Sequence, residues 1–176
     1  MAYDQINPNG RDKIPRSARS TEPAWVTTVA LPPEAAPFDL QAAINAAGDG
    51  EPTVIELNSD IILNGYDIKI PQDKIIKLTS AGAEITHSID ANRLFRVLSV
   101  SSQAALYLEN IIITGGVGTD SGAGVSVFGG TLVMNNNAAI TGNQASGAGA
   151  GVLNRNGGTF CMNGGEITNN TAGTEG

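Results

Sequence analysis

The chain has 176 residues, of which 22 are glycine and 15% are charged, and its formal net charge is −7. This length fits one domain with a buried core, and the acidic balance argues against a nucleic-acid partner. A single cysteine excludes an internal disulfide framework, and no stretch approaches the roughly 20 apolar residues that a membrane insertion requires.

Residues 1–33 are predicted to form an extended arm, because five prolines in this segment disfavour regular structure. The segment Trp25–Val29 is nevertheless strand-like. We expect Trp25 to contact the body of the protein or a neighbouring subunit. A basic cluster of Arg11, Lys13, Arg16 and Arg19 is then expected to contact an acidic surface of a partner. The alternative for this arm is a solvated tail.

Residues 34–176 are predicted to form the folded domain, which begins with a helix over residues 38–47. Asp39 is expected to cap the start of the helix, and Gly48 follows its end. Its apolar residues recur on one face. We expect this face to cover the first turn of the strands that follow, whose edge would otherwise be bare.

Short apolar segments separated by Gly, Asn and Asp then predict a succession of strands. The predicted strands are Val54–Leu57, Ile61–Leu63, Ile75–Leu78, Ala83–Ile85, Phe95–Val100, Leu106–Leu108 and Ile111–Ile113.

The segment 122–172 contains one pattern twice, with an offset of 27 or 28 residues. Gly122–Val125 returns as Gly149–Val152, and Thr131 and Ile140 return as Thr159 and Ile167. A period of this length indicates stacked units. A unit of about 27 residues with short strands and tight corners is typical of one coil of a parallel β-helix, in which neighbouring coils lie about 4.8 Å apart.

The repeat resembles the right-handed, pectin-lyase-like β-helix repeats of bacterial surface adhesins that are related to the polymorphic outer-membrane proteins. Their Gly-Gly-Ala-apolar motif corresponds to Gly122–Val125 and Gly149–Val152. Their aromatic-x-x-Asn motif corresponds to Ile140–Asn143 and Ile167–Asn170, with Ile in place of the aromatic residue. The strands predict an all-β parallel β-helix of about five coils. The resemblance implies that this β-helix is right-handed, and it also implies the helical cap.

Alignment of the coils predicts columns of stacked side chains. Two inward columns contain Leu57, Leu78, Leu108, Met134 and Met162, and Leu63, Ile85, Ile113, Ile140 and Ile167. A third column contains Thr86, Thr114, Thr141 and Thr168, and Asn143 stacks over Asn170 as a structural ladder.

An outward column contains Glu56, Lys77, Tyr107, Val133 and Cys161, and becomes apolar toward its end. A row of outward apolar side chains indicates a covered face, so Tyr107, Val133 and Cys161 are candidate contacts for a partner, the folded arm or a ligand. The alternative is a set of scattered apolar surface residues.

The sequence predicts no catalytic, cofactor-binding or metal-binding residues, and hence no cofactor and no enzymatic activity. Glycoside hydrolysis needs two carboxylates about 5 to 9.5 Å apart, and the acids after residue 100 do not pair. These acids are Glu109, Asp120, Glu166 and Glu175, and the only histidine, His87, lies beside no nucleophile arrangement.

We therefore expect a non-catalytic structural or binding module of a cell-surface adhesin, with a host surface or a polysaccharide as partner. The alternatives are a phage tail-fibre, virion or filament subunit assembled through the arm, and a carbohydrate-active enzyme. The last coil lacks a visible cap, which favours a homo-oligomer or a longer chain through this coil. The N-terminus shows no secretory signal, and the expected location is extracellular, at the cell surface or in a virion.

Overall fold

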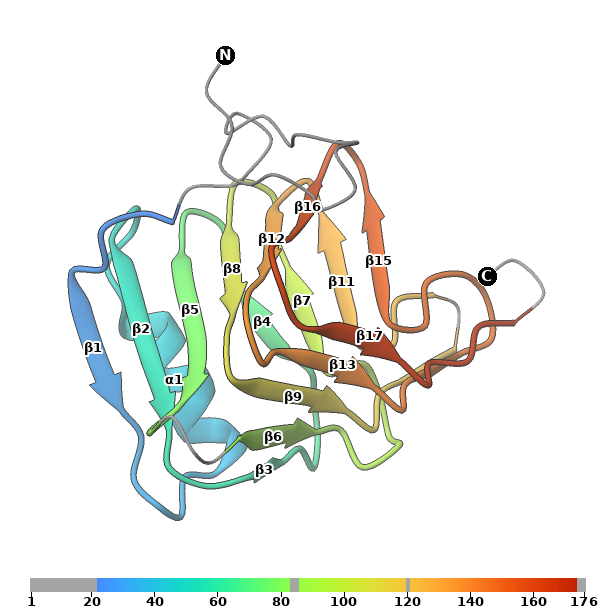
Figure 1. Cartoon of the computed structure of the whole chain (residues 1–176), viewed down its shortest axis with the longest axis horizontal. Helices are drawn as coiled ribbons and strands as arrows, with labels where there is room; N and C mark the ends of the chain where they lie inside the picture. Colours follow the sequence, from blue (N-terminus) through green and yellow to red (C-terminus); the bar gives the residue numbers. More distant parts are fainter. Residues whose placement is uncertain (1–21, 83–85, 120, 174–176) are drawn as a thin grey trace, which may run out of the picture.

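The protein is a parallel β-helix of about five coils, as the sequence predicts (Figure 1). The computed structural model describes residues 22–82, 86–119 and 121–173. The chain winds through three main sheets, and every pair of neighbouring strands in them is parallel. In Figure 1 the coils progress from β1 and β2 at the left to β15 and β17 at the right.

We refer to the three sheets by number. The first sheet contains β1 (Thr27–Ala30), β2 (Pro52–Leu57), β5 (Ile75–Ser80), β8 (Ala105–Leu108), β12 (Thr131–Met134) and β16 (Thr159–Met162). The second contains β3 (Ile61–Ile62), β6 (His87–Asp90), β9 (Ile111–Thr114), β13 (Ala139–Thr141) and β17 (Glu166–Thr168). The third contains β4 (Ile68–Ile70), β7 (Leu98–Val100), β11 (Val125–Phe128) and β15 (Val152–Arg155).

A small additional sheet pairs β10 (Val117–Gly118) with β14 (Gln144–Ala145) at a corner. The predicted strand Ala83–Ile85 lies outside the described residues, and the strand predicted at Phe95–Val100 begins only at Leu98.

The register of the clean repeats is confirmed. Val125 pairs with Val152, and Thr131 pairs with Thr159. Ile140 pairs with Ile167 in the second sheet. Each side chain of one coil therefore stacks on its counterpart in the next, which is the basis of the columns.

The predicted inward column of the first sheet is confirmed from Leu78 to Met162 and is wrong at Leu57, whereas that of the second sheet is wrong in its first two members. Leu78 pairs with Ile55 and not with Leu57, whose partner is Ser80. In the second sheet the column begins with Ile61 and Ile89 and not with Leu63 and Ile85. These slips are of two or four residues, and an even slip keeps each side chain on its side of the sheet, so the alternation of apolar residues does not reveal it.

The same slips change the other two columns. The outward column begins with Thr28 and Val54 rather than Glu56 before it reaches Lys77. Thr86 does not belong to the threonine column, because the residue that precedes Thr114 in this column is Asp90. Only the threonines of the regular coils stack, and the Oγ1 atoms of Thr141 and Thr168 lie 3.4 Å apart.

Aliphatic residues from every coil form one continuous core along the axis, and their burial is the main source of stability. The turns between strands carry residues with positive φ, many of them asparagine. Asn137, Asn156 and Asn169 are examples, with φ between 54° and 58°. Asparagine adopts this conformation more easily than most residues, which explains its frequency at the corners.

The helix α1 (Pro37–Ala46) covers the first coil, as predicted, although it begins and ends one residue earlier. Asp39 is not the capping residue. It lies at the third helical position, where its Oδ2 accepts a hydrogen bond of 2.8 Å from the backbone N–H of Ala36. Leu40 and Ile44 are completely buried against the end of the core.

The helix also covers a strand edge. The side-chain amide of Gln41 donates to the carbonyl oxygen of Lys69 (2.9 Å) and accepts from the N–H of the same residue (2.8 Å). Gln41 thus replaces a neighbouring strand at the outer edge of β4. On the first sheet, β1 covers the outer edge of β2 in the same way.

The opposite end of the solenoid is more exposed. Met162 and Ile167 belong to inward columns, but 47% and 36% of their surfaces are accessible. Met134 and Ile140, one coil earlier in the same columns, are completely buried. The last coil therefore presents apolar side chains along the axis.

Candidate functional sites

The outer face of the first sheet is contacted by the arm at Glu22 and Trp25. The ring of Trp25 packs edge-on against Tyr107, with ring centroids 5.1 Å apart, and its Nε1 donates to Glu22 (2.8 Å). Lys77 lies beneath, with its Nζ 5.1 Å from the Trp25 ring centroid and 3.1 Å from Glu22. The arm is thus fixed across two neighbouring strands, β5 and β8.

Lys77 is the centre of this contact because it pairs with two carboxylates. Its second partner is Glu109, at 2.5 Å, and only 13% of the Lys77 side chain is accessible. Burial by itself would lower the pKa of Lys77, but the hydrogen bonds and charges of Glu109 and Glu22 outweigh it and raise the pKa above 10.5. Lys77 is therefore held in its charged form.

The three residues of the candidate partner face differ in accessibility. Tyr107 and Val133 are buried, although both point outward from the sheet, and Cys161 is partly exposed. Of the candidate arm contacts, Trp25 lies on this face, whereas Arg11, Lys13, Arg16 and Arg19 lie outside the described residues.

The outer face of the third sheet carries a groove that the sequence analysis did not identify. Its lining contains an aromatic ring, Phe128, and six polar residues, which are Arg96, Ser99, Ser101, Ser102, Ser126 and Arg155. Ser99 and Ser126 stack in one outward column, which Lys69 precedes and Leu153 follows. Three strand spacings of about 4.8 Å make this column about 14 Å long.

Arg96 is held in place at the side of the groove by two carbonyl oxygens, those of Ser121 (2.7 Å) and Gly122. A guanidinium has five N–H donors, and three of those of Arg96 make no hydrogen bond to the residues that the structure describes. Ser99 donates to Asp67, which leaves its oxygen as an acceptor. Over half of the Phe128 surface is exposed, which makes it one of the few accessible aromatic rings among the described residues.

The strands of the third sheet carry positive charge. Lys69 and Arg155 are their only charged residues, and neither takes part in an ion pair within the described part of the chain. The strands of the second sheet carry Asp90 and Glu166 and no lysine or arginine. In a chain with a net charge of −7, the third sheet is thus the face best suited to an anion.

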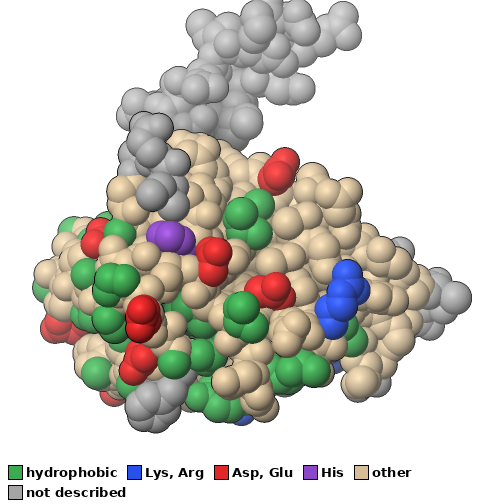
Figure 2. All heavy atoms as spheres, turned by 90° about the horizontal axis from the view of Figure 1, so that it is seen from below, with side chains coloured by type: hydrophobic (Ala, Val, Ile, Leu, Met, Phe, Trp, Pro, Cys, Tyr) green, Lys and Arg blue, Asp and Glu red, His purple; other side chains and the backbone are tan. Residues whose placement is uncertain are grey.

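Figure 2 shows the lower side of the molecule, where carboxylates and the histidine lie among hydrophobic side chains. The Nδ1 atom of His87 is 3.6 Å from Asp60, whose other contact is the N–H of Ser88 at 2.7 Å. The hydroxyl of Ser80 accepts from the N–H of His87 and donates to the carbonyl oxygen of Asn110. These hydroxyl and carboxylate groups thus make structural hydrogen bonds.

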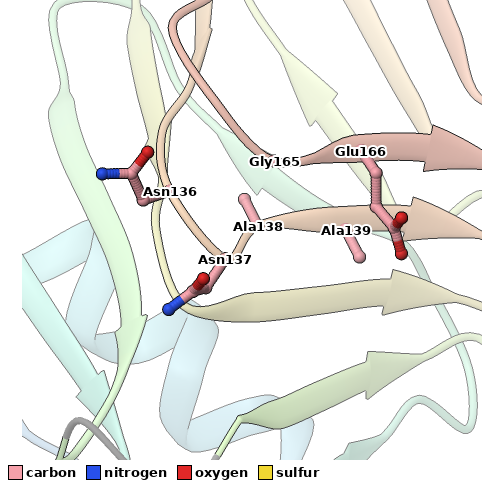
Figure 3. A pocket seen from close by; sticks show the side chains of 6 residues that line it. All are labelled: Asn136, Asn137, Ala138, Ala139, Gly165 and Glu166. Carbon is pink, nitrogen blue, oxygen red and sulfur yellow. The ribbon is translucent and has the colours of Figure 1, made fainter.

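A hollow lies at the corner between β12 and β13, close to the start of β17 (Figure 3). Asn136, Asn137 and Glu166 line it together with two alanines and a glycine. In Figure 3, the side chains of Asn136 and Glu166 lie at opposite ends of the hollow and do not converge. This arrangement offers no set of groups for catalysis.

Asn143 and Asn170 stack as the sequence predicts. Asn143 is 1% accessible, and its Oδ1 accepts from the N–H of Gly116 (2.8 Å). Its Nδ2 donates to Oδ1 of Asn170 (2.9 Å), which also accepts from the backbone N–H of Asn143. The side chains satisfy backbone groups at a tight corner.

The described residues contain no group of three or more His, Cys, Asp or Glu placed to hold a metal ion. In the same part of the chain, the one helix is too short to cross a membrane. Sequence reasoning missed the groove because its residues come from β7, β11, β15 and a corner, and no linear motif joins them. The one available signal was the 27-residue spacing that stacks Ser126 on Ser99.

Comparisons with protein-family models, with curated proteins and with solved structures each gave no match to this chain.

Proposed function

We propose that this protein is a non-catalytic binding module of the kind found in cell-surface adhesins, and that its third sheet binds an acidic polysaccharide. The observation that supports the proposal best is the groove with Arg96, Arg155 and the exposed ring of Phe128. A β-helix suits this role, because its stacked coils form a stiff support with long flat faces.

The groove offers the contacts that an acidic sugar needs. Guanidinium groups bind carboxylate or sulfate, often through two parallel hydrogen bonds. Serine hydroxyls can donate to or accept from sugar hydroxyls. Phe128 provides an apolar surface for the C–H face of a sugar ring. The column of about 14 Å from Lys69 to Leu153 would accommodate an extended chain that runs along the axis.

Binding of the purified chain to a polyuronate, to a sulfated glycan and to a neutral glucan of similar length tests this proposal. We expect binding to one of the acidic polymers, weakening with salt, and little binding to the glucan. Phe128→Ala should weaken it about tenfold, in line with roughly 1.4 kcal/mol for a lost ring contact. Arg93→Ala is the matched control, because Arg93 is exposed and does not line the groove.

Equal binding to the neutral glucan, or no effect of Phe128→Ala, would contradict the proposal. The appearance of new reducing ends during incubation would instead identify the protein as a carbohydrate-active enzyme.

A second candidate is a virion or filament subunit that assembles through its arm. The contact of Glu22 and Trp25 with Lys77 and Tyr107 favours it, because a neighbouring subunit could receive the same segment. Light scattering of the full chain and of a variant without residues 1–26 distinguishes the two. Large assemblies that disappear on truncation support this candidate, and particles of unchanged small size in both samples oppose it.

A further inference from the structure

A second hollow lies beside the groove, where α1 meets the outer edge of β4. One aromatic ring and several polar side chains line it, and its lining residues are Gln41, Asn45, Tyr66, Asp67, Lys69 and Pro71. The hollow continues along the helix past Ala42 and Ala46, where its volume is about 600 Å³. This volume lies within the range of roughly 300 to 1,000 Å³ that is usual for ligand pockets. We call this surface the helix hollow.

The helix hollow and the groove are continuous. Ser99, which lines the groove, donates a hydrogen bond to Asp67, which lines the helix hollow. Ser99 also pairs with Lys69 in the register of β4 and β7. A ligand that follows the outward column from Leu153 over Ser126 and Ser99 therefore reaches the helix hollow at the next strand.

The polar side chains of the helix hollow have groups available for a ligand. Gln41 donates a hydrogen bond of 3.1 Å to Oδ1 of Asn45, which fixes the orientation of the Asn45 amide. The Nδ2 of Asn45 makes no hydrogen bond to a residue that the structure describes, and the same holds for the Nζ of Lys69. Both side chains are exposed. They can donate to the hydroxyl, carboxylate or sulfate oxygens of an acidic sugar.

Tyr66 provides the apolar part of the helix hollow. It is 43% accessible, and Phe128 in the groove is 52% accessible. No other aromatic side chain whose burial is described is as exposed as these two. An aromatic surface with a few polar groups around it is the usual composition of a ligand site. The two most exposed rings thus lie on one continuous path across the third sheet to the helix.

We propose that the helix hollow is a second subsite for the acidic polysaccharide, in which Tyr66 packs against a sugar ring while Asn45 and Lys69 bind its polar groups. This proposal rests on the proposed function of the groove and extends the bound length of the chain. In the register of the sheet, Arg155 lies three strands and two residues from Lys69, a distance of about 16 Å. An oligosaccharide covers this distance and a single sugar does not.

Calorimetric titration of the full chain with oligosaccharides of two lengths tests the proposal. The probes are a disaccharide and an octasaccharide, each prepared from polymannuronate and from heparin. We expect the octasaccharide of one series to bind at least about tenfold more tightly than its disaccharide, because it reaches both subsites. Tyr66→Ala should weaken the octasaccharide about tenfold and change the disaccharide less than about twofold. An unchanged octasaccharide affinity in this variant would overturn the proposal.

Two further variants separate the role of the ring from a general effect. Tyr66→Phe keeps the ring and should bind the octasaccharide within about threefold of the original chain. Ile62→Ala removes another exposed apolar side chain, 60% accessible, from β3 in the second sheet, and should leave binding unchanged. A loss in Tyr66→Phe as large as in Tyr66→Ala would contradict the ring contact, and a similar loss in Ile62→Ala would contradict its location.

The charge of Lys69 gives an independent measurement. Lys69→Met should weaken the octasaccharide about fivefold at low salt and make its binding less dependent on salt, since one screened ionic contact is lost. Arg93→Met is the matched control, because Arg93 is exposed and lines neither the groove nor the helix hollow. Equal salt dependence in Lys69→Met and in the original chain would oppose the assigned contact.

The same titrations distinguish failure of this proposal from failure of the proposed function. Octasaccharide binding that Phe128→Ala impairs and Tyr66→Ala does not would retain the groove and reject the helix hollow. Absence of binding for both octasaccharides would reject both sites.

Discussion

At the scale of single residues, Asn143 shows how a polar side chain becomes part of the core. A buried asparagine is costly unless its donors and acceptor are satisfied. Here the side-chain oxygen of Asn143 accepts a hydrogen bond from the N–H of Gly116. Its Nδ2 donates to the carbonyl oxygens of Ile113 and Thr141 and to Oδ1 of Asn170. It therefore replaces the backbone partners that the tight corner cannot provide.

We expect Asn143→Ala to reduce the free energy of unfolding by roughly 3 kcal/mol, because it leaves several buried backbone groups without partners. Asn170→Ala should cost roughly 1 kcal/mol, since Asn170 is more accessible and water can replace its contacts. Urea denaturation measures both. Equal losses of unfolding free energy in the two variants would indicate that the buried hydrogen bonds of Asn143 contribute no more than the accessible ones of Asn170.

Lys77 makes the stability of the arm contact dependent on pH. Its pKa is raised above 10.5 in the folded protein, so its contribution is fully present below this value and is lost as the pH rises through the raised pKa. Thermal melts should show a lower midpoint above pH 10.5. Lys77→Met should reduce stability by roughly 1 kcal/mol at pH 8 and weaken this alkaline loss.

Lys69→Met provides the control for that series, because Lys69 is exposed and forms no ion pair within the described residues. If both variants show the same alkaline transition, other groups are responsible for it.

At the scale of elements, α1 does more than cover the core. Gln41 presents an amide to β4 in the way that a neighbouring strand presents its backbone. Lys74 completes the junction, since its Nζ donates to the carbonyl oxygens of Asn45 and Ala47 at the end of the helix and pairs with Asp49 (2.8 Å). The helix is thus attached at both its middle and its end.

Gln41→Leu should increase hydrogen exchange at the Lys69 amide about tenfold, because the edge of β4 loses its acceptor. Gln41→Glu keeps an acceptor for this N–H and should have a smaller effect. Gln72→Leu is the control, as the Gln72 side chain bonds to the Gln103 side chain and to no other described residue. Faster exchange in the control as well would indicate a general loss of stability.

At the scale of the whole molecule, the two ends of the solenoid differ. The helix and β1 close the first end, whereas the last coil exposes residues that belong to inward columns. In a stacked fold each coil contacts only its neighbours, so residues of the same type should contribute differently along the axis.

Ile113 and Ile167 allow a direct comparison, because both lie in the inward column of the second sheet. Ile113 is completely buried and Ile167 is 36% accessible. Ile113→Ala should cost roughly 3 kcal/mol and Ile167→Ala roughly 1 kcal/mol in urea denaturation of the monomer. Equal losses in the two variants would contradict this difference between buried and exposed positions of one column.

The sequence by itself determined the parallel β-helix, the helical cap and the register of the regular coils. Repeated glycine, asparagine and apolar positions at 27 or 28 residues admit little besides stacked coils, because each unit can bury its apolar side only on the next. Val125 over Val152 and Asn143 over Asn170 follow directly from this spacing.

Only the tertiary structure decided the register of the first two coils, because a slip of two or four residues leaves the alternation of apolar residues unchanged and the corner lengths there vary. It also decided the surfaces. The groove joins Arg96, Ser126 and Arg155 from separate coils, and the arm contact joins Glu22 to Asn135 across more than a hundred residues. Such groups meet only when the coils stack.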